Sequence, residues 1–116
     1  MSSDYHDLLT RAWGQHKVAV HLLNVTFPLA KEPKILWGVV NSLIRSLELV
    51  EKFQPVNPLL NQLKELWELH QKCPVEFRHK EQVVLCTEDY QCQFLTEKKV
   101  KGYLLETEII LKKMAI

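Results

Sequence analysis

The sequence contains little of the residues that mark flexible or cross-linked chains. Its 116 residues include three glycines, five prolines and three cysteines. The low glycine and proline counts argue against extended disorder. The cysteines are odd in number and show no Cys-x-x-Cys spacing. A disulfide framework is therefore not expected, and reduced thiols are typical of cytosolic proteins.

An excess of charge of one sign is also lacking. The 15 basic and 14 acidic side chains nearly cancel, and the balance holds in both parts of the chain: eight and seven in residues 1–73, seven and seven in residues 74–116. No long-range field draws such a chain to nucleic acid or to an anionic membrane. The sequence has neither a basic-then-apolar leader nor a run of about 20 apolar residues. We expect a soluble, cytoplasmic protein that does not enter a membrane.

Apolar residues at helical spacing are abundant. Hydrophobic residues make up 47% of the chain, enough for one core, so residues 1–116 are predicted to form a single domain. Repeats of three and four predict helices over about residues 3–26, 34–53, 58–73 and 96–114. Pro28 and Pro33 in FPLAKEP predict a short connection between the first two helices. Asn57 and Thr96 are suited to cap the third and fourth.

Each predicted helix has one seam of residues expected to face the core. The four seams, in chain order, are Leu9, Ala12, Trp13, His16, Ala19, Val20 and Leu23; Leu36, Val40, Leu43, Leu47 and Val50, with Trp37 and Ile44 beside them; Leu59, Leu63, Leu66, Trp67 and His70; and Val100, Tyr103, Leu104, Thr107, Leu111 and Met114.

The segment before the last helix changes its period. In EQVVLC and YQCQF, β-branched and aromatic residues lie on either side of the polar connector TEDY. This pattern predicts a β-hairpin over about residues 81–95, which must pack on the helices or pair with another chain because an isolated hairpin is marginally stable. The predicted fold class is all-α: an antiparallel up-and-down four-helix bundle with a short β-hairpin between helices 3 and 4.

The first two helices are apolar over more than one stripe. Val18, Leu22 and Val25 lie outside the seam of the first helix, and Ile35, Val39, Leu49 and Phe53 extend the apolar surface of the second. Such faces need a cover. We therefore predict a homodimer, with Leu22 and Val25 as candidate binding residues. The alternatives are that the four-helix core covers part of these faces or that another protein is the partner.

Two Trp-x-x-His pairs, Trp13 with His16 and Trp67 with His70, each place two rings on one helix face. A metal site would use the two histidines with Cys73. Carboxylate-bridged sites in helical bundles also need inward Glu residues, which the seams lack. A zinc site needs about four ligands, and the candidates are irregularly spaced: Cys73, His79, Cys86 and Cys92. We predict that each histidine packs on its tryptophan, and we expect neither a metal nor a cofactor.

Catalytic patterns are scarce. The sequence has no Gly-x-Ser-x-Gly elbow, no glycine-rich phosphate loop and no evident base partner for a cysteine. The segment FRHKE carries Arg78, His79 and Lys80, which are candidates for binding the phosphates of a nucleotide or nucleic acid. Solvated charges leading into the hairpin are the plainer interpretation.

The overall pattern resembles the HEPN superfamily (higher eukaryotes and prokaryotes nucleotide-binding domains). HLLNVTFPLAKEPKILWGVVNSLIRSLELVEKF followed by CPVEFRHKEQVVLCTEDYQ is similar to small archaeal proteins without an assigned activity that carry such a bundle. HEPN ribonucleases use an Arg-x4-6-His motif on a late helix, and two chains combine their motifs at a dimer interface. RAWGQH, Arg11 to His16, has that spacing, but it lies on the first helix and Ala12 follows the arginine where a polar residue is usual.

Geometry adds a constraint on that motif. Five residues at about 100° each leave Arg11 and His16 about 140° apart around a helix axis. The main hypothesis is therefore a noncatalytic helical interaction or accessory protein that acts as a homodimer. The alternatives are a metal-independent HEPN-type ribonuclease with Arg11 and His16 as catalytic residues, and a nucleotide or nucleic-acid binding module that uses Arg78, His79 and Lys80.

Overall fold

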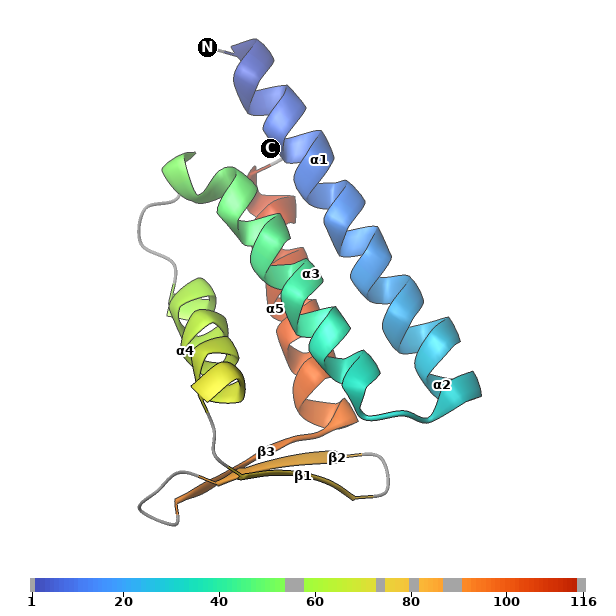
Figure 1. Cartoon of the computed structure of the whole chain (residues 1–116). Helices are drawn as coiled ribbons and strands as arrows, with labels where there is room; N and C mark the ends of the chain where they lie inside the picture. Colours follow the sequence, from blue (N-terminus) through green and yellow to red (C-terminus); the bar gives the residue numbers. More distant parts are fainter. Residues whose placement is uncertain (1, 54–57, 73–74, 80–81, 87–90, 115–116) are drawn as a thin grey trace.

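The computed structural model describes residues 2–53, 58–72, 75–79, 82–86 and 91–114. Most of these residues are helical, and a short antiparallel sheet lies across one end of the helices (Figure 1). The long helices are α1 (Ser2–His21), α3 (Lys34–Val50), α4 (Pro58–Lys72) and α5 (Glu97–Met114). Along the chain they alternate in direction (Figure 1). Within the described part of the chain, no helix has the length and apolar character needed to cross a membrane.

The long helices lie where the sequence predicts them. Helix α3 begins at Lys34 and ends in a 3₁₀ turn, η2 (Glu51–Phe53), which together match the expected 34–53. Pro58 is the first residue of α4, as its missing N–H favours. The backbone N–H of Lys99 donates a hydrogen bond to Oγ1 of Thr96 at 3.2 Å, so Thr96 caps α5 as expected.

Helix α3 is the central element of the fold. It packs against α1, α4 and α5, and its whole predicted seam is buried. Val39, expected on an outer apolar face, is also fully buried. A helix with neighbours on several sides must be apolar over most of its circumference. The core of the same chain therefore covers much of the surface that the sequence assigned to a partner.

Small residues bring α1 and α3 close together. Gly38, Ser42 and Ser46 recur every fourth residue on α3, where i, i+4 positions form one ridge. The Ser46 hydroxyl donates a 2.7 Å hydrogen bond to the carbonyl oxygen of Ala12. At Gly38, a Cβ atom would lie 3.3 Å from Cδ1 of Leu22. The absence of bulk on this ridge thus sets the spacing between the two helices.

The first helix continues past Pro28, and the expected break at this proline is wrong. A π turn, η1 (Leu22–Thr26), and a short helix, α2 (Phe27–Ala30), follow α1 without interruption. The N–H of Phe27 bonds to the carbonyl of Leu22, five residues back. Proline is disruptive where it replaces an N–H in a regular i to i−4 series, and here that series is already interrupted. The helix ends instead at Ala30, and the next residue, Lys31, has a left-handed backbone (φ 54°).

The sheet has three strands rather than the two of the predicted hairpin. They are β1 (Val75–His79), β2 (Gln82–Cys86) and β3 (Cys92–Leu95), in the order β1-β2-β3 with both pairs antiparallel. The β2–β3 pair is the predicted hairpin, and its connector 87–90 lies outside the described residues. Strand β1 was interpreted as a charged lead-in. Its sequence VEFRH does alternate, and charge is common on edge strands.

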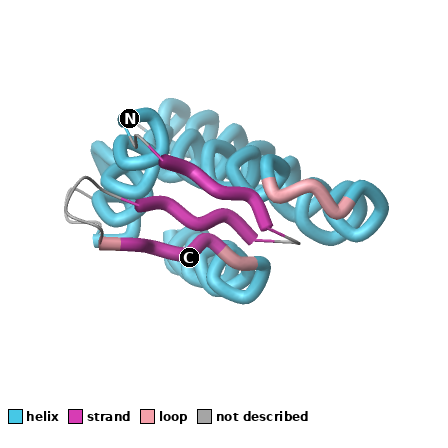
Figure 2. The backbone as a smooth tube through the Cα atoms, turned by 60° about the horizontal axis from the view of Figure 1, so that its bottom comes forward, coloured by secondary structure: helices cyan, strands magenta, loops and turns pink. Residues whose placement is uncertain are grey.

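One face of the sheet completes the core. Val83, Leu85 and Leu95 are fully buried and belong to the same hydrophobic cluster as the seams of α3, α4 and the first turns of α5. Directly paired residues of an antiparallel sheet point to the same side, and the next residues along each strand point to the other. The opposite face, with half-exposed Phe94, lies on the side facing the viewer in Figure 2.

A second hydrophobic cluster joins the other ends of the helices. It consists of Leu9, Ala12, Val50, Leu111 and Met114. The Tyr5 hydroxyl donates a hydrogen bond to the Met114 carbonyl, and its ring packs edge-on against Phe53 with ring centroids 4.9 Å apart. The start of α1 is therefore held against the ends of α3 and α5.

Candidate functional site

The two Trp-x-x-His pairs belong to different places in the fold. In each pair the ring centroids are 5.4 Å apart. Trp13 and His16 lie on α1, whereas His70 stacks on Trp37 of α3 at 4.0 Å with an angle of 20° between the rings. Both histidines thus pack on tryptophan rings, and His70 also links α4 to α3.

The structure gives no support for a metal centre. Within the described ranges, no group of three or more His, Cys, Asp or Glu side chains is placed to hold a metal ion. Cys73, the third ligand of the proposed His16 and His70 site, lies outside those ranges. His79 is in β1 and pairs with Gln82, at the opposite end of the sheet from Cys86 and Cys92.

Arg11 and His16 differ sharply in exposure. The Arg11 side chain is exposed, and its Nη1 lies 3.9 Å from Oδ2 of Asp7. His16 is only 5% exposed, and its Nε2 is buried without a hydrogen-bond partner among the described residues. Helical rotation accounts for the difference, because the two residues lie about 140° apart around α1. A single chain in this conformation does not present both side chains to one ligand.

Arg11 lies instead in a surface groove between α1 and α3. The groove has a volume of about 510 Å³ and is lined by Arg11, Gly14, Gln15, Arg45, Glu48 and Leu49. It continues into a neighbouring hollow of about 580 Å³, with which it shares Glu48 and Leu49. Gly14 leaves the floor open, since no atom lies within 4 Å of the position of a Cβ there. Two guanidinium groups, one from each helix, therefore line one cavity.

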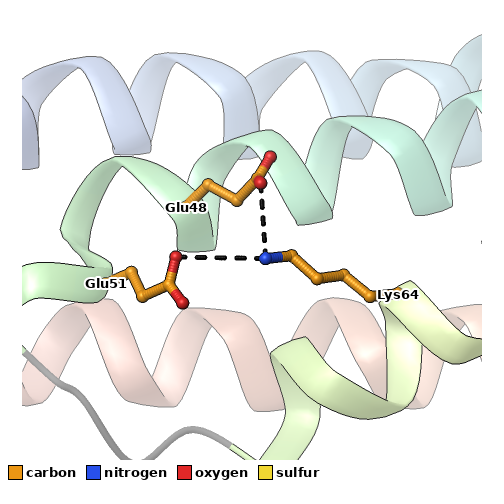
Figure 3. Close-up of polar contacts among 3 residues, drawn as sticks. All are labelled: Glu48, Glu51 and Lys64. Carbon is orange, nitrogen blue, oxygen red and sulfur yellow. Dashed lines mark ion pairs between the residues drawn. The ribbon is translucent and has the colours of Figure 1, made fainter.

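The acidic residue of this groove already has a cationic partner. Lys64 of α4 reaches across to α3, with its Nζ 3.4 Å from Glu48 Oε2 and 4.0 Å from Glu51 Oε2 (Figure 3). The three side chains are between 42% and 48% exposed, so solvent screens these pairs and each contributes little stability. Arg45 makes no ion pair with any residue that the structure describes. Two arginines and one glutamate are therefore the charged residues that line the groove.

The candidate interface residues Leu22 and Val25 also lie in different environments. Leu22 is partly buried and packs against the main core beside Gly38. Val25 is 45% exposed. The same continuous helix also exposes Val18 (47%) and Leu29 (83%). Leu29 was assigned to a loop from the sequence, so the apolar face extends one turn farther than expected.

The basic segment of residues 78–80 lies at the edge of the sheet. Arg78 and His79 are the last two residues of β1 and pair with Val83 and Gln82. Lys80 lies outside the described residues. The backbone thus places two of the three candidates on an edge strand, next to the turn into β2.

A smaller cavity at the junction of α4, β3 and α5 was not anticipated. It measures about 230 Å³ and is lined by Gln62, Glu65, Leu66, Gln93 and Tyr103. Burial raises the pKa of Tyr103 above its usual value of 10.0; a hydrogen bond with Gln62 acts in the opposite direction, and Glu106 adds to the increase. Tyr103 was predicted only as a seam residue, because α4, which contributes Gln62, Glu65 and Leu66 to this cavity, is distant from it in the sequence.

Comparisons with known proteins identify no relative. No family model matches the chain, and neither the curated proteins nor the solved structures contain a match.

Proposed function

We propose that this chain is a noncatalytic helical interaction protein that forms a homodimer through the outer face of its first helix. The observation that carries the proposal is the row Val18, Leu22, Val25 and Leu29, spaced four, three and four residues apart. Three of these side chains are exposed, and Leu29 is the most exposed large hydrophobic residue among those described. The π turn lies within this row, so the support is the apolar surface that Val18, Val25 and Leu29 expose along one continuous helix, which a second copy would cover.

The shape of the molecule supports the same conclusion. The Cα atoms span 47 × 33 × 17 Å, with a radius of gyration of 14.9 Å, whereas a compact chain of this length has about 13 Å. A helix with its side chains is about 10 Å across, so the thin dimension holds about two layers. A second copy on the α1 face would add layers to a flat molecule. The two-fold symmetry of such a dimer would bring the same row from each chain together.

The HEPN-like architecture is part of this proposal. Four long helices that alternate in direction, with α3 in the centre, support an up-and-down bundle of that kind. In such a dimer the role of the chain is to present a paired helical surface to a further protein. No catalytic step is required of it.

The test is the solution mass of the chain, measured by light scattering across a dilution series. We expect two copies of the 13.6 kDa chain, and we expect the double variant Val25→Glu, Leu29→Glu to be a monomer because the new charges face each other across the seam. The matched control is Leu105→Glu, Ile109→Glu on α5, where both side chains are comparably exposed. The control should remain a dimer. A wild-type monomer at every concentration, or dissociation of the control alone, contradicts the proposal.

The groove between α1 and α3 favours a second candidate function, the binding of a nucleotide or nucleic acid. Arg11 and Arg45 line it together, and its one carboxylate, Glu48, has Lys64 within 3.4 Å. We expect single-stranded RNA to bind at low salt and Arg45→Gln to weaken binding and to reduce the salt slope by about one. Lys112→Gln removes the same charge from α5 and should have no such effect. Equal effects of the two variants, or no binding by the wild type, contradict it.

The ribonuclease alternative gives His16 the proton transfers and Arg11 the stabilisation of phosphate charge. Its support is the position of Arg11 in the groove and the unsatisfied Nε2 of His16. Because His16 is buried, this alternative requires the partner chain to complete the site or α1 to move. Cleavage of RNA by the wild type that is lost in Arg11→Gln would support it, and an inactive wild-type dimer would remove it.

A further inference from the structure

Two cysteines face each other directly across the β2–β3 pair. Cys86 is the last residue of β2, Cys92 is the first of β3, and the register makes them partners. Val83, Leu85 and Leu95 occupy the buried face, so the alternation along each strand places both cysteines on the opposite face. Both side chains are reduced thiols in this structure. They therefore lie side by side on the face of the sheet away from the helices.

Strand geometry allows these two thiols to be joined. Directly opposed residues in an antiparallel pair have Cα atoms about 4.5 or about 5.5 Å apart, depending on the hydrogen-bond pattern. A disulfide accepts Cα separations of about 4.4 to 6.8 Å. Its Cβ atoms must approach to about 3.5 to 4.5 Å, which is at most about 1 Å closer than an ordinary opposed pair. Cys86 and Cys92 form the last pair of the described β2–β3 register, and Cys86 also pairs with Val75 of β1.

The exposures of the two cysteines assign them different roles. Cys92 is exposed and Cys86 is half-buried. We propose that Cys86 and Cys92 form a reversible cross-strand disulfide by exchange with a low-molecular-weight disulfide such as glutathione disulfide. The Cys92 thiolate attacks one sulfur of glutathione disulfide and releases a glutathione thiolate. The Cys86 thiolate then attacks the Cys92 sulfur of the mixed disulfide and releases the second glutathione.

Each oxidation event thus moves two electrons from the protein to the oxidant and leaves two reduced glutathiones. The bond closes residues 86–92 into a covalent loop, which restricts the unfolded chain. It also fixes the start of β3, whose last residue, Leu95, lies in the core next to the N-terminus of α5. The proposal does not depend on the dimer or on the groove between α1 and α3.

The experiment is oxidation of the folded chain with glutathione disulfide, followed by denaturation, alkylation and mass spectrometry. We expect one of the three thiols to remain alkylatable. Cys86 and Cys92 lie in one tryptic peptide, residues 81–98, which should have lost two hydrogens. Cleavage after Glu88 separates the two cysteines only when the disulfide is absent, so it locates the bond. Dithiothreitol should restore three alkylatable thiols.

Two variants complete the test. Cys73→Ser removes the third thiol and should leave formation of the disulfide unchanged. Cys86→Ser removes the second attack, so Cys92 should retain one glutathione as a stable mixed disulfide. Circular dichroism checks that each variant is folded. A bond between Cys73 and either partner, a bond between two chains, or glutathione retained on Cys92 of the wild type would overturn the proposal.

Discussion

The hydroxyl of Ser46 on α3 donates a hydrogen bond to the carbonyl of Ala12 on α1, and both residues are fully buried. This bond lies where the two helices approach closely through small side chains. We expect Ser46→Ala to lower the free energy of unfolding by about 1 kcal/mol, the usual net contribution of one hydrogen bond. Ser46→Leu should cost about 1–3 kcal/mol because the larger side chain separates the helices. Urea unfolding measures both, and Thr10→Ala on the exposed face of α1 is the control.

Substitutions of His16 distinguish a packing role of this residue from a catalytic role. Its buried Nε2 has no partner among the described residues, and an unsatisfied buried polar atom costs about 1–3 kcal/mol. We expect His16→Leu to unfold at a higher urea concentration than the wild type, whereas His16→Ala should be less stable because it leaves a cavity. A destabilised His16→Leu protein would show that Nε2 makes a favourable interaction. Loss of RNA cleavage in a stable His16→Leu protein would support the ribonuclease alternative.

The raised pKa of Tyr103 predicts that the stability of the folded chain depends on pH in alkaline solution. The pKa of its phenol is raised in the folded state, mainly by burial. The folded chain therefore retains the proton longer than the unfolded chain does. The associated stability is complete below pH 10 and is lost as the pH rises through the higher folded-state pKa. We expect Tyr103→Phe to lose less stability than the wild type between pH 9 and 11 in urea titrations, and equal slopes would contradict this.

The glycines give three contrasting substitutions. Gly14 and Gly102 lie in α1 and α5 with no atom within 4 Å of a Cβ position. Replacing either with alanine should stabilise the chain by about 0.5–1 kcal/mol, because alanine restricts the unfolded state and favours helix. At Gly38 the added carbon would lie 3.3 Å from Cδ1 of Leu22. We therefore expect Gly38→Ala to increase the stability of the chain less than the other two substitutions do. Thermal unfolding of the three proteins side by side provides the comparison.

The sequence predicts the long helices well because their apolar residues follow a single period. The start of α4 at Pro58 and the cap at Thr96 were predicted because each depends on local backbone chemistry. The passage of the helix through Pro28 was not predicted, since the π turn that precedes it has no strong signal in residue type. Strand β1 was missed because its charged residues outweighed its alternation.

The candidate site was harder to predict, because it depends on which helices are neighbours. Arg45 was assigned to an ordinary polar face, and only the packing of α3 on α1 places it in a groove with Arg11. The facing of Cys86 and Cys92 depends on strand register, which the connector length alone does not fix. Val39 was assigned to an outer face because the sequence does not reveal that α3 is central.

The π turn has a consequence for the numbering of the first helix. Such a turn accommodates one residue more than an α-helix of the same length, so η1 amounts to a one-residue insertion. Deleting the exposed Asn24 would therefore give a regular helix in which the later side chains keep their directions around the axis. If residues 22–26 formed a regular α-helix without such a deletion, every later side chain would rotate by about 100°, and Phe27, now buried, would leave the core. The π turn thus keeps Phe27 on the core side of a helix that contains one extra residue.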